Sequence, residues 1–117
     1  MSAAGRPALI CTVIATAAAC GKGERTAPPV ATDRVNLPKS YEFAPTAITV
    51  RTGATVTWVN ADVFTHAVRL TDDGGAVLVM KPGDSVHFTF STPGLHHYDC
   101  SFHPHDMRGT VLVTAAP

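Results

Sequence analysis

A chain of 117 residues is long enough to fold as one domain around a core and too short for two. Lysine plus arginine number nine, as do aspartate plus glutamate, so no basic field exists to attract nucleic acid, and we expect no such partner. Charged residues are sparse, whereas threonine, valine, glycine and proline are plentiful, which favours strands and tight turns over helices.

The first 20 residues are typical of a secretion signal. Arg6 gives a weakly basic start, and the apolar run from Pro7 to Ala19 is too short for a stable membrane-spanning helix. Residues 17–20, AAAC, resemble a bacterial lipobox, although alanine replaces the usual leucine at its first position. Lipidation of Cys20 is therefore expected, and this lipid is the only membrane contact we expect. Cleavage directly before Cys20 at an Ala-x-Ala signal is the alternative, and both interpretations export the protein to the periplasm or cell surface.

Residues 21–40 contain proline, lysine and arginine and show no apolar period. We expect them to form a flexible linker, stiffened locally at Pro28-Pro29. The folded domain is then expected to span residues 41–117.

From Tyr41 onwards, short runs of alternating apolar and polar residues are separated by turn residues. The expected strands cover residues 48–51, 55–59, 66–70, 76–80, 86–90, 95–100 and 109–114. Between two of them, Pro82 followed by Gly83 is the order that a type II turn prefers. Seven or eight short strands with turns between them predict an all-β fold, a β-sandwich.

Cys100 is the only thiol that we expect in the folded domain, because Cys11 and Cys20 both lie in the signal. It therefore has no partner for an internal disulfide. An unpaired cysteine in an exported protein suggests a metal site or a reactive role. A buried, inert cysteine is the simpler alternative.

The residues around Cys100 favour a metal. Between Cys100 and Met107 the chain carries one thiol, one thioether and the two imidazoles of His103 and His105. Far upstream, His66 begins a strand and shares its inward face with apolar side chains, because strand side chains alternate. Thiolate and imidazole are strong copper ligands, and two histidines, one cysteine and a long axial methionine form the blue-copper arrangement.

Several motifs match one family. They are Phe43-x-Pro45, Val56-Thr57-Trp58-Val59-Asn60, His66-x-Val68, the Pro82-Gly83 turn, Phe88-Thr89-Phe90, Pro93-Gly94 before Tyr98-x-Cys100, Cys100-x-x-His103-Pro104, Met107 and Gly109-Thr110-Val111. In these residues, from about Tyr41 to Thr114, the chain resembles the small cupredoxins of the plastocyanin and amicyanin type. The resemblance implies a Greek-key sandwich with one type 1 copper ion held by His66, Cys100, His103 and Met107. It also implies one-electron exchange with redox partner proteins, by a monomer that is not an enzyme.

Three departures from the family pattern leave alternatives open. Ala67 stands where the family usually has an asparagine whose side chain ties the ligand loops together, so we expect that hydrogen bond to be lost. His96 replaces an aromatic core residue. The ligand loop is one residue longer than in amicyanin, so His103 is the expected loop ligand and His105 its rival.

Two other functions remain possible from the sequence. Copper delivery or sequestration is the main alternative to electron transfer, because Ala67 cannot brace the loops and His105 adds a further imidazole. Catalysis by Cys100 as a nucleophile is disfavoured, since no orienting Asn or Asp and no oxyanion motif is recognisable beside it. Zinc is a possible occupant of the same ligands, but it would do no redox work.

Overall fold

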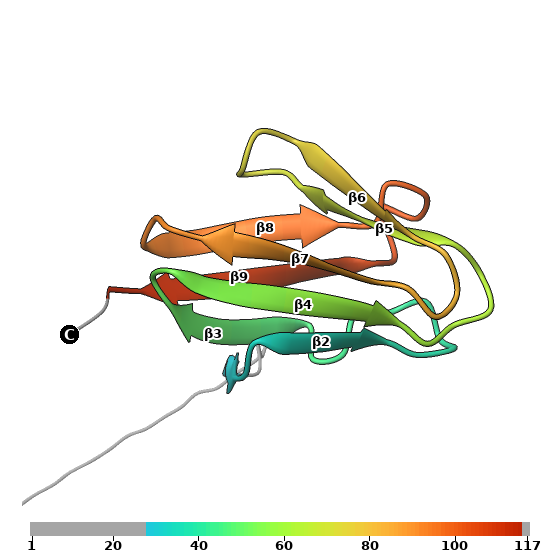
Figure 1. The fold of residues 1–117 in the computed structure, drawn as a ribbon, viewed down its shortest axis with the longest axis horizontal. Coiled ribbons are helices and arrows are strands. Elements are labelled where there is room, and N and C mark those ends of the chain that lie inside the picture. The colour runs from blue at the N-terminus through green and yellow to red at the C-terminus, as the bar shows by residue number, and fades with distance from the viewer. Residues whose placement is uncertain (1–27, 116–117) are drawn as a thin grey trace, which may run out of the picture.

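The computed structural model describes residues 28–115, and nine strands make up its regular structure (Figure 1). They are β1 (Val30–Ala31), β2 (Arg34–Leu37), β3 (Ala47–Arg51), β4 (Ala54–Asn60), β5 (His66–Leu70), β6 (Ala76–Met80), β7 (Ser85–Phe90), β8 (Gly94–Asp99) and β9 (Arg108–Thr114). No helix within residues 28–115 is long and apolar enough to cross a membrane.

The strands form two sheets that pack face to face. One sheet has the order β1-β3-β9-β8-β5-β6 and the other the order β2-β4-β7. The β1–β3, β2–β4 and β3–β9 pairs are parallel, whereas β4–β7, β5–β6, β5–β8 and β8–β9 are antiparallel. The predicted all-β sandwich is confirmed.

The core lies between the two sheets and is made by the inward side of each alternating strand. In β4, for example, Val56 and Trp58 are fully buried while their neighbours are at least partly exposed. Trp58 packs edge-on against Tyr98, with ring centroids 5.3 Å apart, and Tyr98 packs in turn against Phe43 at 4.8 Å. These large aromatic side chains bury much apolar surface and hold the sheets at a fixed spacing.

The folded part of the chain begins earlier than the sequence predicted. Within the expected linker 21–40, β1 and β2 are ordered strands, and Val35 and Leu37 of β2 are fully buried. Strand β2 pairs in parallel with β4, so that Val35 lies opposite Trp58 in the register. The boundary at residue 41 is therefore wrong: β2 completes the three-stranded sheet. The remainder of that linker, 21–27, and the signal at 1–20 lie outside the described residues.

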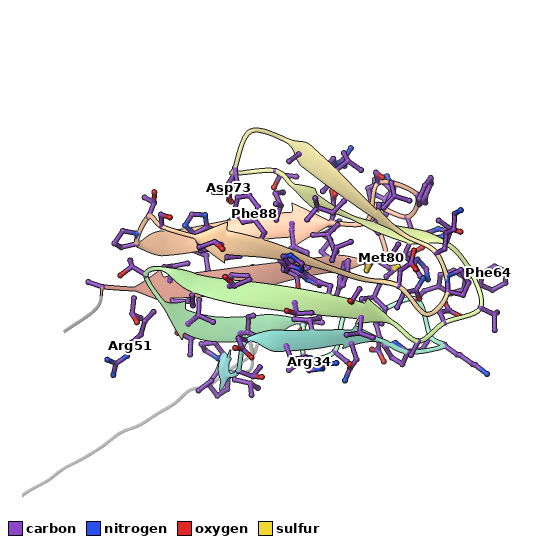
Figure 2. The ribbon with its side chains drawn as sticks, in the orientation of Figure 1. Arg34, Arg51, Phe64, Asp73, Met80 and Phe88 are labelled. Carbon is purple, nitrogen blue, oxygen red and sulfur yellow. The ribbon has the colours of Figure 1, made fainter. Side chains whose placement is uncertain are left out.

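Several connections meet at one end of the sandwich. Because β5 and β9 both run antiparallel to β8, they begin where β8 ends. Met80, which lies opposite His66 in the β5–β6 register, and Phe64, in the connection before β5, mark this end in Figure 2. The fold thus brings the start of β5 beside the loop that follows β8.

Candidate metal centre

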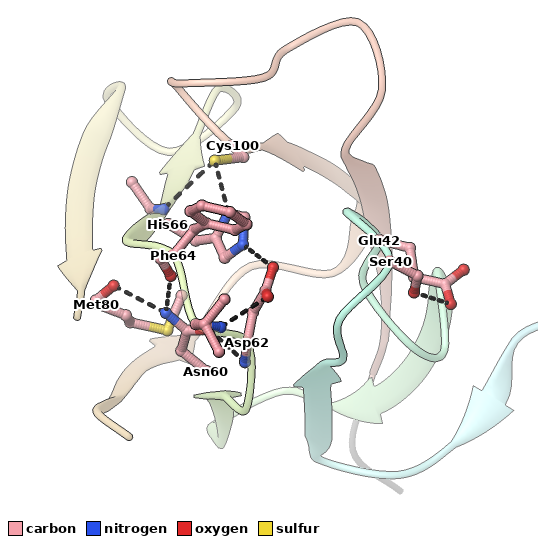
Figure 3. A network of polar contacts seen from close by, with 10 residues as sticks. Ser40, Glu42, Asn60, Asp62, Phe64, His66, Met80 and Cys100 are labelled. Carbon is pink, nitrogen blue, oxygen red and sulfur yellow. Dashed lines mark hydrogen bonds and ion pairs between the residues drawn. The ribbon is translucent and has the colours of Figure 1, made fainter. Parts of the chain in front are cut away.

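His66 and Cys100 lie side by side at the end of the six-stranded sheet. His66 is the first residue of β5, and Cys100 directly follows β8, the neighbouring strand. Both side chains are fully buried, and Nδ1 of His66 lies 3.8 Å from Sγ of Cys100. The predicted pairing of a distant histidine with the loop cysteine is therefore present in the structure (Figure 3).

Ala67 links the two segments through its backbone. Its amide N–H donates to Sγ of Cys100 at a distance of 3.4 Å. An alanine has no side chain to brace the loops, as the sequence predicted, but the peptide group crosses from β5 to the Cys100 segment instead. This contact holds the sulfur of Cys100 beside the start of β5.

Asp62 holds the other side of the His66 ring. Its Oδ2 lies 2.8 Å from Nε2 of His66, and the side chains of both residues are buried. Because an ionised carboxylate can only accept, Nε2 must donate, which leaves Nδ1 as the nitrogen facing Cys100. This hydrogen bond also holds the pKa of Asp62 below its ordinary value, so the carboxylate stays ionised.

Asn60 keeps Asp62 in place. Its Oδ1 accepts from the backbone N–H of Asp62 at 2.9 Å, and its Nδ2 donates to the carbonyls of Phe64 and Met80 at 2.8 and 3.1 Å. The 61–65 connection is thereby folded against β6 in a largely buried hydrogen-bond network (Figure 3). Such a network fixes the orientation of His66 from behind.

The loop from Cys100 to Met107 is closed by its own backbone. The amide of Cys100 donates to the carbonyl of Met107 at 3.0 Å, which extends the β8–β9 ladder by one pair. Inside the loop, the carbonyl of His103 accepts from the amide of Met107 at 2.9 Å, an α-turn of five residues. Residues four apart in such a turn lie on the same side, so His103 and Met107 are neighbours. Met107 is fully buried, whereas His105 is exposed.

His103 lies against aromatic rings rather than hydrogen-bonding groups. Its ring centroid is 5.7 Å from that of His66 and 4.9 Å from that of Tyr41. No three His, Cys, Asp or Glu side chains within the described part of the chain converge on a single point. The structure thus brings His66 and Cys100 into direct contact, and the ring of His103 lies against the ring of His66.

The two donor atoms in contact are spaced as ligands of one copper ion would be. First-row metals bind imidazole nitrogen at about 2.0 Å and thiolate sulfur at about 2.3 Å, so two such donors at a trigonal angle lie roughly 3.8 Å apart. The separation of Nδ1 of His66 from Sγ of Cys100 is 3.8 Å. One thiol, two imidazoles and a buried thioether are the soft and intermediate ligands that copper prefers over harder cations.

Two contributors to this site were missed in the sequence. Asp62 belongs to no motif of its own, and its position four residues before His66 is the available signal. Tyr41 was treated only as the start of the strand region, and no sequence pattern places its ring beside two histidines from other segments.

A family model described as copper-binding proteins of the plastocyanin/azurin family matches residues 34–114. Plastocyanin from Scenedesmus fuscus is 34% identical over 85 residues, which cover 61% of this chain and 85% of that protein. Amicyanin from Paracoccus denitrificans is 38% identical over 69 residues, covering 55% of this chain and 52% of that one. The chain thus spans about half the length of this amicyanin.

Solved structures agree with these matches. A novel purple cupredoxin from Nitrosopumilus maritimus superposes with a TM-score of 0.61 at 28% identity, covering 69% of this chain and 98% of that one. The oxidized form of an amicyanin mutant gives the same TM-score at 30% identity and covers 68% of this chain and 79% of its own. The family match includes both His66 on β5 and Cys100 directly after β8.

Proposed function

The chain belongs to the plastocyanin/azurin family of copper-binding proteins, and we propose that it carries single electrons on one copper ion held by His66, Cys100, His103 and Met107. Members of this family are copper electron carriers rather than enzymes, so copper as the cofactor and the absence of an enzymatic role are confirmed as predicted. We further propose the four ligands, the Cu(I)/Cu(II) couple and export to the periplasm or cell surface.

The observation that carries the proposal is the contact between His66 and Cys100. A buried imidazole whose Nε2 is bound to Asp62 presents Nδ1 to a buried sulfur at 3.8 Å. In a purely structural role, a buried cysteine needs neither the amide of Ala67 nor an oriented histidine. Both features hold the sulfur beside an imidazole nitrogen, as two ligands of one metal ion would be held.

Copper, when bound, supplies one-electron exchange between its two oxidation states. The chain's own residues supply a rigid and dry setting: Cys100, His66 and Met107 are fully buried, and all three lie at the ends of strands whose register is fixed. Ligands on rigid elements move little, so the same residues suit both oxidation states. His103 is half-buried and lies nearest to solvent among the four proposed ligands.

The redox partners are expected to contact the face where His103 is partly exposed. Three large apolar side chains around this end are exposed by more than half: Val63, Phe64 and Phe102. An apolar surface of this kind suits brief contact with another protein.

Export is a further part of the proposal. Residues 1–20 and the lipidation site at Cys20 lie outside the described residues, so their support is the sequence pattern alone. Mass spectrometry of the membrane-extracted protein should show an acylated N-terminal Cys20. A mature terminus at Cys20 without acyl mass would remove the lipid anchor and leave export in place.

The test of function is a visible spectrum of the copper-loaded, oxidised protein. Charge transfer from a Cys100 thiolate to Cu(II) should give intense blue or green colour, and Cys100→Ser should abolish it. Ser101→Ala, at the next position of the loop, is the matched control and should keep the colour. A wild-type protein that binds copper but stays colourless when oxidised would favour copper delivery instead.

A further inference from the structure

Tyr41 joins the two histidines that we assign to copper. Its ring meets that of His103 edge-on, with centroids 4.9 Å apart and planes at 78°, and meets that of His66 at 5.9 Å and 87°. On its other side it stacks on Phe64 at 5.8 Å, with the planes 20° apart. Segments before β3 and before β5 thus enclose the imidazoles in one aromatic cluster.

The backbone of Tyr41 is held in an unfavourable conformation. Its φ is +52°, and no other described residue except glycine has a positive φ. A bulky side chain rarely adopts this region, so surrounding contacts must keep it there. Ser40 and Glu42, on either side, are joined by a side-chain hydrogen bond of 2.8 Å that closes the turn (Figure 3). The ring contacts of Tyr41 are the interactions that stabilise this backbone conformation.

The two imidazoles differ in their support. His66 is bound through Nε2 to the buried carboxylate of Asp62. The ring of His103, by contrast, makes no hydrogen bond to any residue within 28–115, and the protein rings that it meets are those of Tyr41 and His66. His103 lies on a loop rather than a strand, so it is the proposed ligand with the greatest freedom to move.

We propose that Tyr41 is a positioning residue of the copper centre, which holds the His103 ring in one orientation through aromatic contact. This inference rests on the proposed function, since it concerns a ligand of that site. A ligand that keeps its place when copper gains or loses an electron lowers the rearrangement needed for each transfer. A ligand that loses its support leaves the ion more readily.

The experiment compares Tyr41→Ala, Tyr41→Phe and Tyr41→Gly in the full copper-loaded chain. Three properties are measured: Cu(I) release to a chromophoric chelator, the Cu(II) EPR spectrum, and electron self-exchange from NMR line broadening in mixtures of both oxidation states. Tyr41→Ala should release Cu(I) about tenfold faster, broaden or shift the EPR spectrum and slow self-exchange. Tyr41→Phe keeps the ring and should restore most of each property.

Tyr41→Gly separates the ring from the backbone. Glycine adopts a positive φ at no steric cost, so this variant should unfold no more easily than Tyr41→Ala and yet release Cu(I) just as fast. Leu95→Ala, at a residue of β8 that is similarly exposed and remote from the site, is the control and should match the wild type in all three properties.

The outcomes distinguish this inference from the proposed function. An intensely coloured wild type whose Tyr41→Ala variant has unchanged Cu(I) release and EPR spectrum would overturn the role of Tyr41 and leave the copper site in place. The same holds if Tyr41→Ala changes self-exchange alone, because the ring would then act at the protein surface. A colourless wild type would overturn the function first.

Discussion

Nε2 of His66 lies 2.8 Å from the carboxylate of Asp62, four residues earlier, in a part of the molecule from which water is excluded. The sequence suggested that Ala67 leaves the copper-binding loops unbraced, and its side chain indeed provides no link. The bracing comes instead from two other groups: the carboxylate of Asp62 behind the histidine and the amide of Ala67 toward the sulfur of Cys100. The side-chain link that an asparagine at position 67 would make is thus replaced by the carboxylate of Asp62 and the peptide N–H of Ala67.

Loss of Asp62 should therefore weaken copper binding. Asp62→Ala leaves Nε2 of His66 without an acceptor in a buried place, and removal of such a partner typically costs about 10–100-fold in metal affinity. Asp62→Asn keeps a hydrogen-bond acceptor for Nε2, so it should cost less copper affinity than Asp62→Ala. It also removes a negative charge, and because that charge stabilises Cu(II) more than Cu(I), its loss should raise the reduction potential. Competition with a chelator and protein-film voltammetry measure the two effects.

The control for Asp62 is Asp106→Asn, which makes the same change at an exposed residue of the ligand loop. It should alter copper affinity little and the potential only slightly, since water screens an exposed charge. Equal effects of the two substitutions would mean that Asp62 acts through overall charge rather than through His66.

The choice between His103 and His105 also has a direct test. The α-turn from His103 to Met107 puts these two residues on the same side of the loop, while His105 is exposed. His103→Ala should abolish the visible absorption of the oxidised protein, and His105→Ala should leave it nearly intact. The opposite result would make His105 the ligand and require a different arrangement of the loop.

The sequence predicted the strands well because their patterns are local. Even the missed strand β2 carries a readable signal, since Val35 and Leu37 alternate with Arg34 and Asn36. The alternation covers only four residues and ends directly before Pro38, so it is too short to stand out as a strand. Strand ends, and therefore His66 and Cys100, could be placed from period two alone.

The support around the site depends on contacts that no local pattern encodes. The carboxylate of Asp62 reaches His66 only because Asn60 folds the connection between β4 and β5. Tyr41 meets the histidines only after three connections have converged at one end of the sandwich. Long-range packing determines both, so no local sequence pattern reveals them.

His96 should make the stability of the protein depend on pH. Burial lowers its pKa, but the hydrogen bond to Asp73 at 2.9 Å, the carbonyl of Thr92 and the nearby charge of Asp72 outweigh this and raise the pKa above its ordinary value. Because the folded-state pKa is raised, its contribution to the free energy of unfolding is fully present below about pH 6.5 and is lost as pH rises through the folded-state value.

His96→Phe, which puts an aromatic residue at this core position, should remove the loss of stability that begins as the pH rises above about 6.5. Urea unfolding at a series of pH values measures it. His87→Gln, at an exposed position of β7, is the control for loss of a histidine and should keep the wild-type profile. A His96→Phe profile that still falls as steeply as the wild type would assign the pH dependence to another group.

Gly109 is required by the ring of Tyr98. The two residues are opposite each other in the β8–β9 register, and a Cβ at position 109 would collide with Cζ and Oη of the tyrosine, which is itself packed between Phe43 and Trp58. Because Phe43 and Trp58 hold that ring in place, Gly109→Ala should lower the free energy of unfolding by about 1–3 kcal/mol. Tyr98→Leu removes the colliding atoms, so the alanine should cost less in that background, as a double-mutant cycle by urea unfolding would measure. An equal cost in both backgrounds would mean that the glycine serves the backbone rather than the tyrosine.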